Sequence, residues 1–341
     1  MGGLDFTMDK QPLVSVIIPV RNASEMLSRC LGAIKKSSYP SYEIIVVDDA
    51  STDASSETAT QNGAFVLRLE RQSGPAEARN RGAERAKGDV LLFVDSDVMI
   101  RHDTIGRVVN DFSEHIEIGA VFGSYDDDPP EKNFASQYKN MVHHFVHQVS
   151  RPEAVTFWAG CGAVRKKAFL DVGGFDAGRY PRPSIEDIEL GYRLRKSGFG
   201  ILLDKEMQVK HLKKWTVKSV LRVDIFDRAI PWTKLILESQ EMVTDLNLQV
   251  SQKISAGLVG LIVLFIPLSF LVPPVFWVVV TILITILVIN KRLFLFFLRL
   301  RGVSFAIRAF GMQLLYYFYS GVTFSVCWVL NTMKSTRKKD S

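Results

Sequence analysis

Residues 88–97, GDVLLFVDSD, decide the fold class, because a continuous apolar run ends there in two carboxylates. An apolar run without polar alternation is typical of a strand that is buried on both faces of a sheet. In open α/β sheets, ligands bind beyond the carboxyl ends of the strands. We therefore expect a strand at 89–94 that carries Asp95 and Asp97 into a ligand site.

Three similar apolar runs precede this one, and helical patterns separate them. We predict strands at Val14–Val20, Tyr42–Asp48 and Ala64–Leu69, with helices at Ser24–Lys36 and after Gly74-Pro75. Buried strands joined by helical crossovers indicate an α/β fold with a mostly parallel sheet that is covered on both faces.

Charge and hydropathy are segregated along the chain. Of its 341 residues 23% are charged, with 42 Lys and Arg against 36 Asp and Glu, yet residues 254–290 carry no charge. The mean hydropathy is +0.11. This segregation excludes a uniformly soluble enzyme, a disordered chain and a disulfide scaffold.

The C-terminal third is predicted to lie in a membrane. Residues 254–290 are long enough for two short spans with a reversal at Pro273-Pro274, and residues 309–333 form a third candidate. Basic residues between 291 and 308 should be cytoplasmic. With three crossings the basic tail, 334–341, would lie outside against the usual charge bias. Either one segment is re-entrant or the rule is broken here, so two or three crossings stay open.

The N-terminal segment and the cysteines give no sign of export. Residues 1–11 lack the apolar core of a signal peptide, and three scattered cysteines indicate reduced thiols in the cytoplasm.

Residues 205–234 hold eight basic side chains against three acidic ones. We therefore predict that residues 216–253 form basic, amphipathic interfacial helices beside an anionic membrane surface.

Two acidic groups follow predicted strands and are candidates for ligand binding. Asp95 and Asp97 can hold a divalent cation such as Mn²⁺ or Mg²⁺, or simply cap the next element. Asp49 can accept a hydrogen bond from a nucleobase, whereas Asp53 fits a plain helix cap better than a ligand contact. Arg79, on the next helix, could meet a phosphate or stack on a base.

A third acidic pair begins a predicted helix at 185–198, with Ser184 as its cap and Gly198 at its end. Glu186 and Asp187 could favour the helix dipole alone, or one of them could be a general base.

Histidines supply further ligand candidates. His211 could complete a metal shell or serve as an ordinary structural histidine. His143 and His147 share a helix face, but no glutamate lies between them as in the zinc motif H-E-x-x-H, so a metal site there is disfavoured.

The order of these pieces carries more information than any one of them. VSVIIPVRN, EIIVVDDASTD, GPAEARNRGAERAKGDVLLFVDSD, FWAGCGAVRKKAFLDVGGFD and IEDIELGYRLRKSG together resemble the family 2 glycosyltransferases, which have a GT-A fold. The resemblance covers about residues 12–215. It implies a Rossmann-like mixed sheet and an inverting, metal-dependent transfer of a sugar from a nucleotide-diphosphate sugar, with a UDP-sugar favoured.

The resemblance also implies roles for individual residues. Asp187 would be the base, with Glu186 beside it, and Asp97 and His211 would hold the metal. The Gly173-Gly174 turn would shape the acceptor edge. The donor would contact Pro19, Val20, Asn22, Asp49, Asp53, Arg79, Asp95, Gly160 and Gly162, and the acceptor would contact Trp158, Lys214 and Trp215.

One departure from the family bears on the product. Processive members and ceramide glucosyltransferases carry Q/R-x-x-R-W after the E-D helix, whereas this chain has His211-Leu-Lys-Lys214-Trp215. We therefore predict the transfer of one sugar to a membrane-associated acceptor, such as a polyprenyl phosphate, a lipid-linked glycan or a glycolipid.

Other functions remain as alternatives. They are a processive polysaccharide synthase or ceramide-type glucosyltransferase, a nucleotidyltransferase, and a non-catalytic scaffold that binds nucleotide sugars. A dehydrogenase is excluded because no G-x-G-x-x-G follows a strand. The expected partners are the bilayer and the nucleotide sugar but no nucleic acid, and a homo-oligomer is left open.

Overall fold

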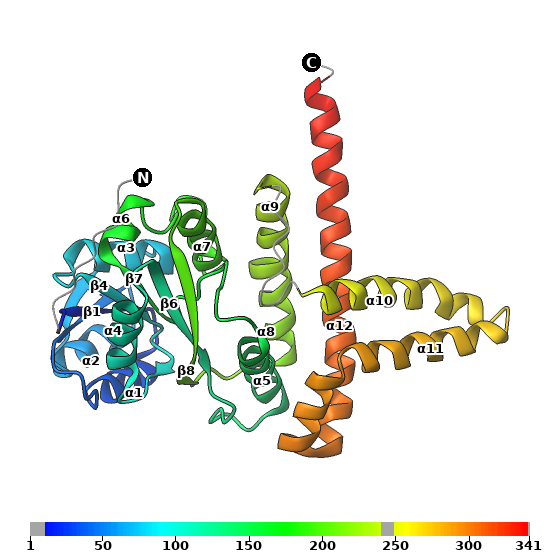
Figure 1. The fold of residues 1–341 in the computed structure, drawn as a ribbon, viewed down its shortest axis with the longest axis horizontal. Helices are drawn as coiled ribbons and strands as arrows, with labels where there is room; N and C mark the ends of the chain where they lie inside the picture. Colours follow the sequence, from blue (N-terminus) through cyan, green and yellow to red (C-terminus); the bar gives the residue numbers. More distant parts are fainter. Residues whose placement is uncertain (1–10, 240–248, 340–341) are drawn as a thin grey trace. The chain divides into compact units, whose positions relative to one another are not determined.

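The computed structural model describes residues 11–239 and 249–339. The described chain forms two compact units, of which the first extends to Lys214 and the second begins at Trp215 (Figure 1).

The first unit is built on one mixed sheet of eight strands in the order β3-β2-β1-β4-β7-β6-β8-β5. The neighbours β3, β2, β1 and β4 are parallel, while β7 runs antiparallel to both β4 and β6. The strands are β1 (Val14–Val20), β2 (Tyr42–Asp48), β3 (Phe65–Arg68), β4 (Val90–Val94), β5 (Val98–Met99), β6 (Ile118–Tyr125), β7 (Cys161–Arg165) and β8 (Gly200–His211).

Helices connect these strands and cover the sheet (Figure 1). The parallel half follows a regular alternation of strand and helix, which right-handed crossovers require. The helices of this unit are α1 (Ser24–Ile34), α2 (Ser55–Gln61), α3 (Pro75–Arg85), α4 (Thr104–Glu114), α5 (Phe134–Val149), α6 (Lys166–Asp171) and α7 (Glu186–Lys196).

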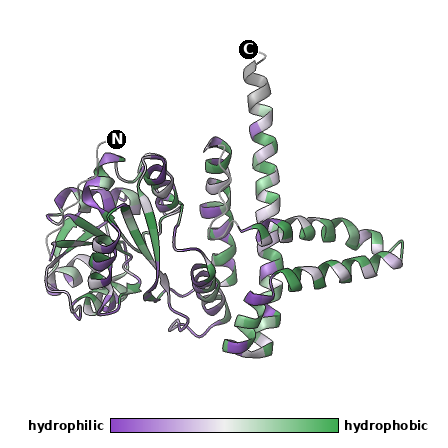
Figure 2. Ribbon diagram, in the orientation of Figure 1, coloured by the Kyte–Doolittle hydropathy of each residue, from purple (hydrophilic) through white to green (hydrophobic). Residues whose placement is uncertain are grey.

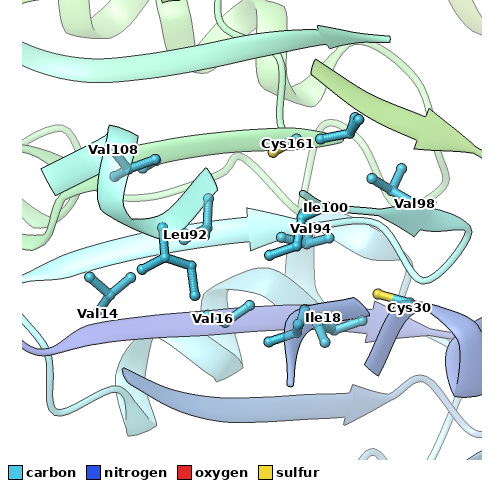
Figure 3. Close-up of a cluster of buried hydrophobic side chains, with 14 of the residues drawn as sticks. Val14, Val16, Ile18, Cys30, Leu92, Val94, Val98, Ile100, Val108 and Cys161 are labelled. Atoms are coloured by element: carbon cyan, nitrogen blue, oxygen red, sulfur yellow. The ribbon is translucent and has the colours of Figure 1, made fainter. Parts of the chain in front are cut away.

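The core lies where the sheet meets α1 and α4. Alternate residues of β1 and β4 point into it, together with the buried thiols of Cys30 and Cys161 (Figure 3). Burial raises the pKa of the Cys161 thiol to about 12, so this side chain is an inert part of the core.

The predicted α/β fold is confirmed, and the first four strands lie within one residue of their expected bounds at either end. The predicted cap of α7 is wrong. The residue before α7 is Ile185, and Ser184 uses its backbone N–H to bond Glu186 Oε2 at 2.8 Å. The start of α2 does bond Asp53, whose Oδ1 accepts the N–H of Ser55, the first residue of the helix, at 3.1 Å and its hydroxyl at 2.6 Å. Asp53 therefore caps α2 from the position before Ala54.

The second unit is helical. It contains α8 (Val217–Arg222), a π-helical turn η1 (Val223–Ala229), α9 (Ile230–Ser239), α10 (Val250–Ser269), α11 (Pro274–Ile289) and α12 (Lys291–Lys339). The backbone of α12 is interrupted at Gly302, where φ is +80°. The predicted interfacial segment 216–253 is helical as far as Ser239, and its residues 240–248 lie outside the described ranges.

The most apolar elements of this unit are α10 and α11, which form an antiparallel hairpin (Figures 1 and 2). Among the described residues, α10 alone is by itself long and apolar enough to cross a membrane. The pair of α11 and residues 291–333 passes the same test only as one span bent by 74°. The reversal predicted at Pro273-Pro274 is present between the two helices of the hairpin.

An ion pair anchors α4 to β8, the strand that ends in His211. The Arg107 guanidinium donates to both carboxylate oxygens of Asp204, at 2.8 and 2.9 Å. Asp111 lies one turn further along α4, and its Oδ2 is buried without a hydrogen-bond donor. Burial and the nearby charge of Asp204 raise the pKa of Asp111 to about 7.

The raised pKa of Asp111 makes the folded protein lose stability as the pH rises. Between about pH 4 and pH 7 the folded state binds this proton more tightly than the unfolded chain, so stability is highest below that range. Asp111→Asn should remove this loss and stabilise the protein at pH 8 by about 1–2 kcal/mol, since the site is partly exposed. Melting curves at pH 5 and pH 8 measure the effect, with the exposed Asp171→Asn as control. An equal shift at both pH values would contradict the assignment.

Candidate functional site

The candidate metal corner is formed by the ends of β4 and β8. Asp97 follows β4, and its Oδ2 lies 3.5 Å from Nε2 of His211, the last residue of β8. The Leu212 N–H donates to the Asp97 carbonyl at 2.8 Å and ties the two segments together. Burial opposes the charge of Asp97, but the hydrogen bond and charge of His211 outweigh it and lower the pKa of Asp97.

An aromatic stack fixes the plane of the His211 ring. Tyr125, at the end of β6, stacks on His211 with ring centroids 4.3 Å apart and an interplanar angle of 11°. The His143 ring lies 4.2 Å from Tyr125, and the Trp158 ring meets Tyr125 edge-on at 4.9 Å. The metal-ligand candidate His211 is therefore stacked on a ring that further aromatic side chains hold in place.

Arg79 joins the two acidic motifs of the sequence. Its guanidinium donates to Asp95 Oδ1 at 2.7 Å and to Glu186 Oε1 at 2.9 Å, and the side chain is buried. The two carboxylates are 91 residues apart along the chain and meet through this one cation. Arg79 was expected to face the nucleoside, but in the structure its two terminal nitrogens are engaged by carboxylates.

The two members of the E-D pair have different surroundings. Glu186 is buried, held by Arg79 and by the Ser184 N–H. Asp187 is half-buried at the start of α7, and its Oδ2 accepts from the Ala159 N–H at 3.1 Å. Of the two, Asp187 is therefore the more exposed carboxylate, while Glu186 is engaged by Arg79.

The ends of β1 and β2 form the expected donor side of the site. Val20 accepts the Asp49 N–H at 2.9 Å, and Asn22 Oδ1 accepts the Thr52 N–H at 2.8 Å. Pro19 precedes them as the residue paired with Val47. Asn22 and Ala50 are the two non-glycine residues with positive φ in the described chain, at +49° and +54°. A positive φ is an unfavourable backbone conformation for a non-glycine residue, and residues in such conformations concentrate at functional sites.

Asp49 holds the loop that precedes α3. Its carboxylate accepts the N–H of Ser73 at 2.6 Å and that of Gly74 at 2.9 Å. Gly74 has φ +87°, and a Cβ there would lie 2.4 Å from the Pro181 carbonyl oxygen. Each carboxylate oxygen retains a second lone pair, so recognition of a base by Asp49 stays a prediction. Asp53 lies at the exposed edge and accepts the Ser24 N–H at 3.0 Å.

The glycines before and within β7 make room for Trp158. A Cβ on Gly160 would lie 2.4 Å from the indole, and one on Gly162 would lie 2.3 Å from the Trp158 carbonyl oxygen. Gly160 also accepts the Asp95 N–H at 3.1 Å. The Gly173-Gly174 turn fixes α3, because Asn80 exchanges two hydrogen bonds with Phe175 just after it.

The remaining predicted positions are less closely tied to this geometry. Lys214 is exposed at the end of the first unit, and Trp215 is buried in the second. His143 and His147 do share a face of α5, with ring centroids 4.0 Å apart. No group of three or more metal-ligating side chains occurs among the described residues, so these histidines belong to the aromatic stack.

Tyr125 is the functional candidate that the sequence reasoning missed. Its signal is weak, because a tyrosine at the end of an apolar strand is common in any sheet. Only the pairing of β6 with β8 brings its ring against His211.

The site fits a divalent cation that binds together with a substrate. Asp97 Oδ2 and His211 Nε2 converge at a separation suited to neighbouring ligands on one Mn²⁺ or Mg²⁺ ion. Two protein ligands leave coordination positions open, and diphosphate oxygens are suited to fill them.

Known glycosyltransferases resemble the first unit of this chain in sequence. Residues 15–173 match the model of the family described as Glycosyl transferase family 2. Glycosyltransferase GlyG of Streptococcus pneumoniae is 34% identical over 163 residues, which are 46% of this chain and 54% of that protein. Poly-beta-1,6-N-acetyl-D-glucosamine synthase of Staphylococcus aureus is 25% identical over 210 residues, 58% of this chain and 49% of the synthase. This chain thus spans about half the length of these curated relatives.

A solved structure resembles more of the chain. The mannosyltransferase PcManGT from Pyrobaculum calidifontis, in complex with GDP-Man and Mn²⁺, aligns with a TM-score of 0.57 at 15% identity. The alignment covers 92% of this chain and 87% of PcManGT. At this identity the likeness shows a shared fold, here a GT-A-like mixed sheet followed by helices.

The ordered motifs, the sheet and the family match agree over the same residues. Residues 15–173, just under half of the chain, thus match glycosyl transferase family 2.

Proposed function

We propose that this protein transfers one sugar from a nucleotide-diphosphate sugar to a membrane-associated acceptor, with inversion at the anomeric carbon. The observation that carries the proposal is the bridge from Asp95 through Arg79 to Glu186. It joins the Asp95-Ser96-Asp97 motif to the Glu186-Asp187 pair. Neither a plain helix cap nor a dipole partner would need that bridge.

The residues divide the chemistry between them. Asp97 and His211 would hold Mn²⁺ or Mg²⁺, which neutralises a diphosphate leaving group when bound. Asp49 and Asn22 order the loops of the donor side. Asp187 would take the proton of an acceptor hydroxyl as its oxygen attacks the sugar, while the bond to the diphosphate breaks on the opposite face. Trp158 and Lys214 are the proposed acceptor contacts within the first unit.

The acceptor is proposed to be lipid-linked because of the second unit. Its hairpin, α10 and α11, exposes many large apolar side chains, among them Phe270, Leu271 and Trp277. Basic residues flank it in sequence, and an anionic membrane surface attracts such residues. We propose a cytoplasmic catalytic unit beside the bilayer, with a UDP-sugar as the first donor to test.

Processive synthesis is the second candidate, supported by the similarity to a poly-N-acetylglucosamine synthase. The stretch His211-Leu-Lys-Lys214-Trp215 argues against it, since it retains only the tryptophan of the processive motif. Chain-length analysis of the product separates the two functions. One added sugar per acceptor is expected, and longer chains would favour the synthase.

A donor panel tests the main proposal. The full chain in detergent is heated with UDP- and GDP-sugars, with and without Mn²⁺ or Mg²⁺, because a bound ligand raises the melting temperature. The stabilising donor, carrying a labelled sugar, is then incubated with a lipid extract. Label in the lipid phase supports the proposal, whereas donor binding without any transfer or hydrolysis would favour a scaffold.

The stack on His211 gives a separate prediction. Tyr125→Ala removes the ring that orients His211, so Mn²⁺ affinity measured with UDP present should fall about 10-fold. Tyr125→Phe keeps the ring and should bind Mn²⁺ like the parent. Calorimetric titration measures both. Equal affinities for the alanine and phenylalanine variants would show that Tyr125 does not position His211.

A further inference from the structure

The tip of the α10–α11 hairpin, residues 270–276, has no polar side chain. Residues 270–276 read FLVPPVF, and Phe270 and Leu271 are 83% and 80% exposed. Ser269, beside the tip, turns its hydroxyl back to the Ile266 carbonyl at 2.7 Å. A loop that emerged on the far side of a membrane would place these apolar side chains in water.

The backbone N–H groups of the tip donate hydrogen bonds within the hairpin. The N–H groups of Phe270, Leu271 and Val272 donate to carbonyls of the last turn of α10, and those of Val275 and Phe276 donate to Val272 and Pro273. Pro273 and Pro274 have no N–H. No N–H group from 270 to 276 therefore lacks an acceptor, which removes the donor part of the cost of placing a turn inside hydrocarbon.

Buried hydrogen bonds join the two ends of the hairpin to each other. The Asn290 amide donates to the Ser255 hydroxyl at 2.8 Å, and the Tyr317 hydroxyl donates to Asn290 Oδ1 at 3.0 Å. These buried groups join α10, α11 and α12. Lys253 and Lys291, which flank this polar group, are the first charges beyond the apolar hairpin at either end.

All 20 residues of α10 would suffice for a crossing, but the part of the hairpin beyond this polar group is short for one. From Ser255 to Phe270 and from Asn290 to Pro274 the helices rise about 22–24 Å at 1.5 Å per residue. The hydrocarbon core of a bilayer is about 30 Å thick. With the polar group at one interface, the tip stops inside the hydrocarbon.

The third apolar segment does not continue in the same direction. The helix of residues 291–333 is bent by 74° from α11. It carries buried Gln313, and Tyr319 donates to Asp224 Oδ2 of η1 at 2.9 Å. A tyrosine-rich helix tied to a charged connection is suited to the membrane interface.

We propose that the hairpin enters the bilayer and returns to the same face, with α12 along that face, so that none of the described segments crosses the membrane. This inference rests on the proposed membrane association. It also resolves the charge conflict of the sequence, because the basic residues around 291–308 and those after 333 then share one side with the catalytic unit.

Cysteine labelling of the full chain in intact membrane vesicles tests the topology. In a Cys327→Ser background, single cysteines replace Val250 at the base, Leu271 at the tip and Met333 on α12, all exposed positions. The remaining Cys30 and Cys161 are buried. A membrane-impermeant maleimide is applied to vesicles of both orientations, and unchanged donor binding confirms that each variant folds.

The Val250→Cys and Met333→Cys variants should both be labelled from the same face of the membrane. The Leu271 variant should label from neither face, at less than about a tenth of its level in detergent, because its surroundings are hydrocarbon. Labelling of Leu271→Cys or Met333→Cys from the face opposite to Val250→Cys would overturn the proposal while leaving membrane association intact. Full labelling of the tip from the base's own face, or a chain that leaves the membrane without detergent, would overturn both.

Discussion

Asp97→Asn should abolish turnover, with kcat at least about 1,000-fold below that of the parent, because a metal that stabilises the leaving diphosphate is worth several kcal/mol. The amide has almost the shape of the carboxylate but carries no charge to balance the cation. The affinity for Mn²⁺ should therefore fall by at least about 100-fold, and donor binding should no longer respond to the metal.

The measurement for Asp97→Asn combines Mn²⁺ titration with transfer of labelled sugar. Asp89→Asn is the matched control, because Asp89 is exposed just before β4, at the opposite end of the strand that Asp97 follows. The control should keep parental binding and turnover. Parental Mn²⁺ affinity in Asp97→Asn would show that the metal corner is placed wrongly.

Asp187→Asn should separate donor binding from transfer. An asparagine can still accept the Ala159 N–H, so the start of α7 and the melting temperature should be retained. It cannot take a proton at neutral pH, and the loss of a general base lowers kcat by about 100- to 10,000-fold. Donor affinity, measured by calorimetry with Mn²⁺ present, should stay at the parental value.

Glu186→Gln is the contrasting variant for Asp187. It removes the charge that Arg79 meets in a buried ion pair, so its melting temperature should fall, which Asp187→Asn should not show. Near-normal transfer by Asp187→Asn would contradict the base assignment. That result would point to a phosphate acceptor, which is already ionised and needs only to be oriented.

The parallel half of the fold could be predicted because its signals are local. Continuous apolar runs such as Val14–Val20 require burial on both faces, and helical patterns between them fix the crossovers. The end of α7 was also predictable, since Gly198 adopts φ +88° where the helix stops. The antiparallel insertion of β7 carried no such signal, because strand order depends on contacts far apart in the chain.

The candidate site shows the same division. The carboxylates Asp95, Asp97 and Asp187 could be identified from their positions after a strand or at a helix start. The partners of these carboxylates could not be identified, because the sequence does not show which carboxylates a side chain such as Arg79 meets in the fold. A buried carboxylate such as Glu186 needs a counterion, and the packing of α3 against the sheet supplies Arg79.

The sequence by itself determined the class of this protein, since composition and ordered motifs report local preferences for burial, strand, helix and charge. It named an α/β region with three acidic motifs and an apolar region without charge. Only the tertiary structure decided which of these groups meet. It placed Tyr125 against His211, joined the acidic motifs through Arg79, and closed the apolar region into a hairpin with a satisfied tip. Those contacts depend on chain segments that are distant in sequence, and only the folded geometry brings them within bonding distance.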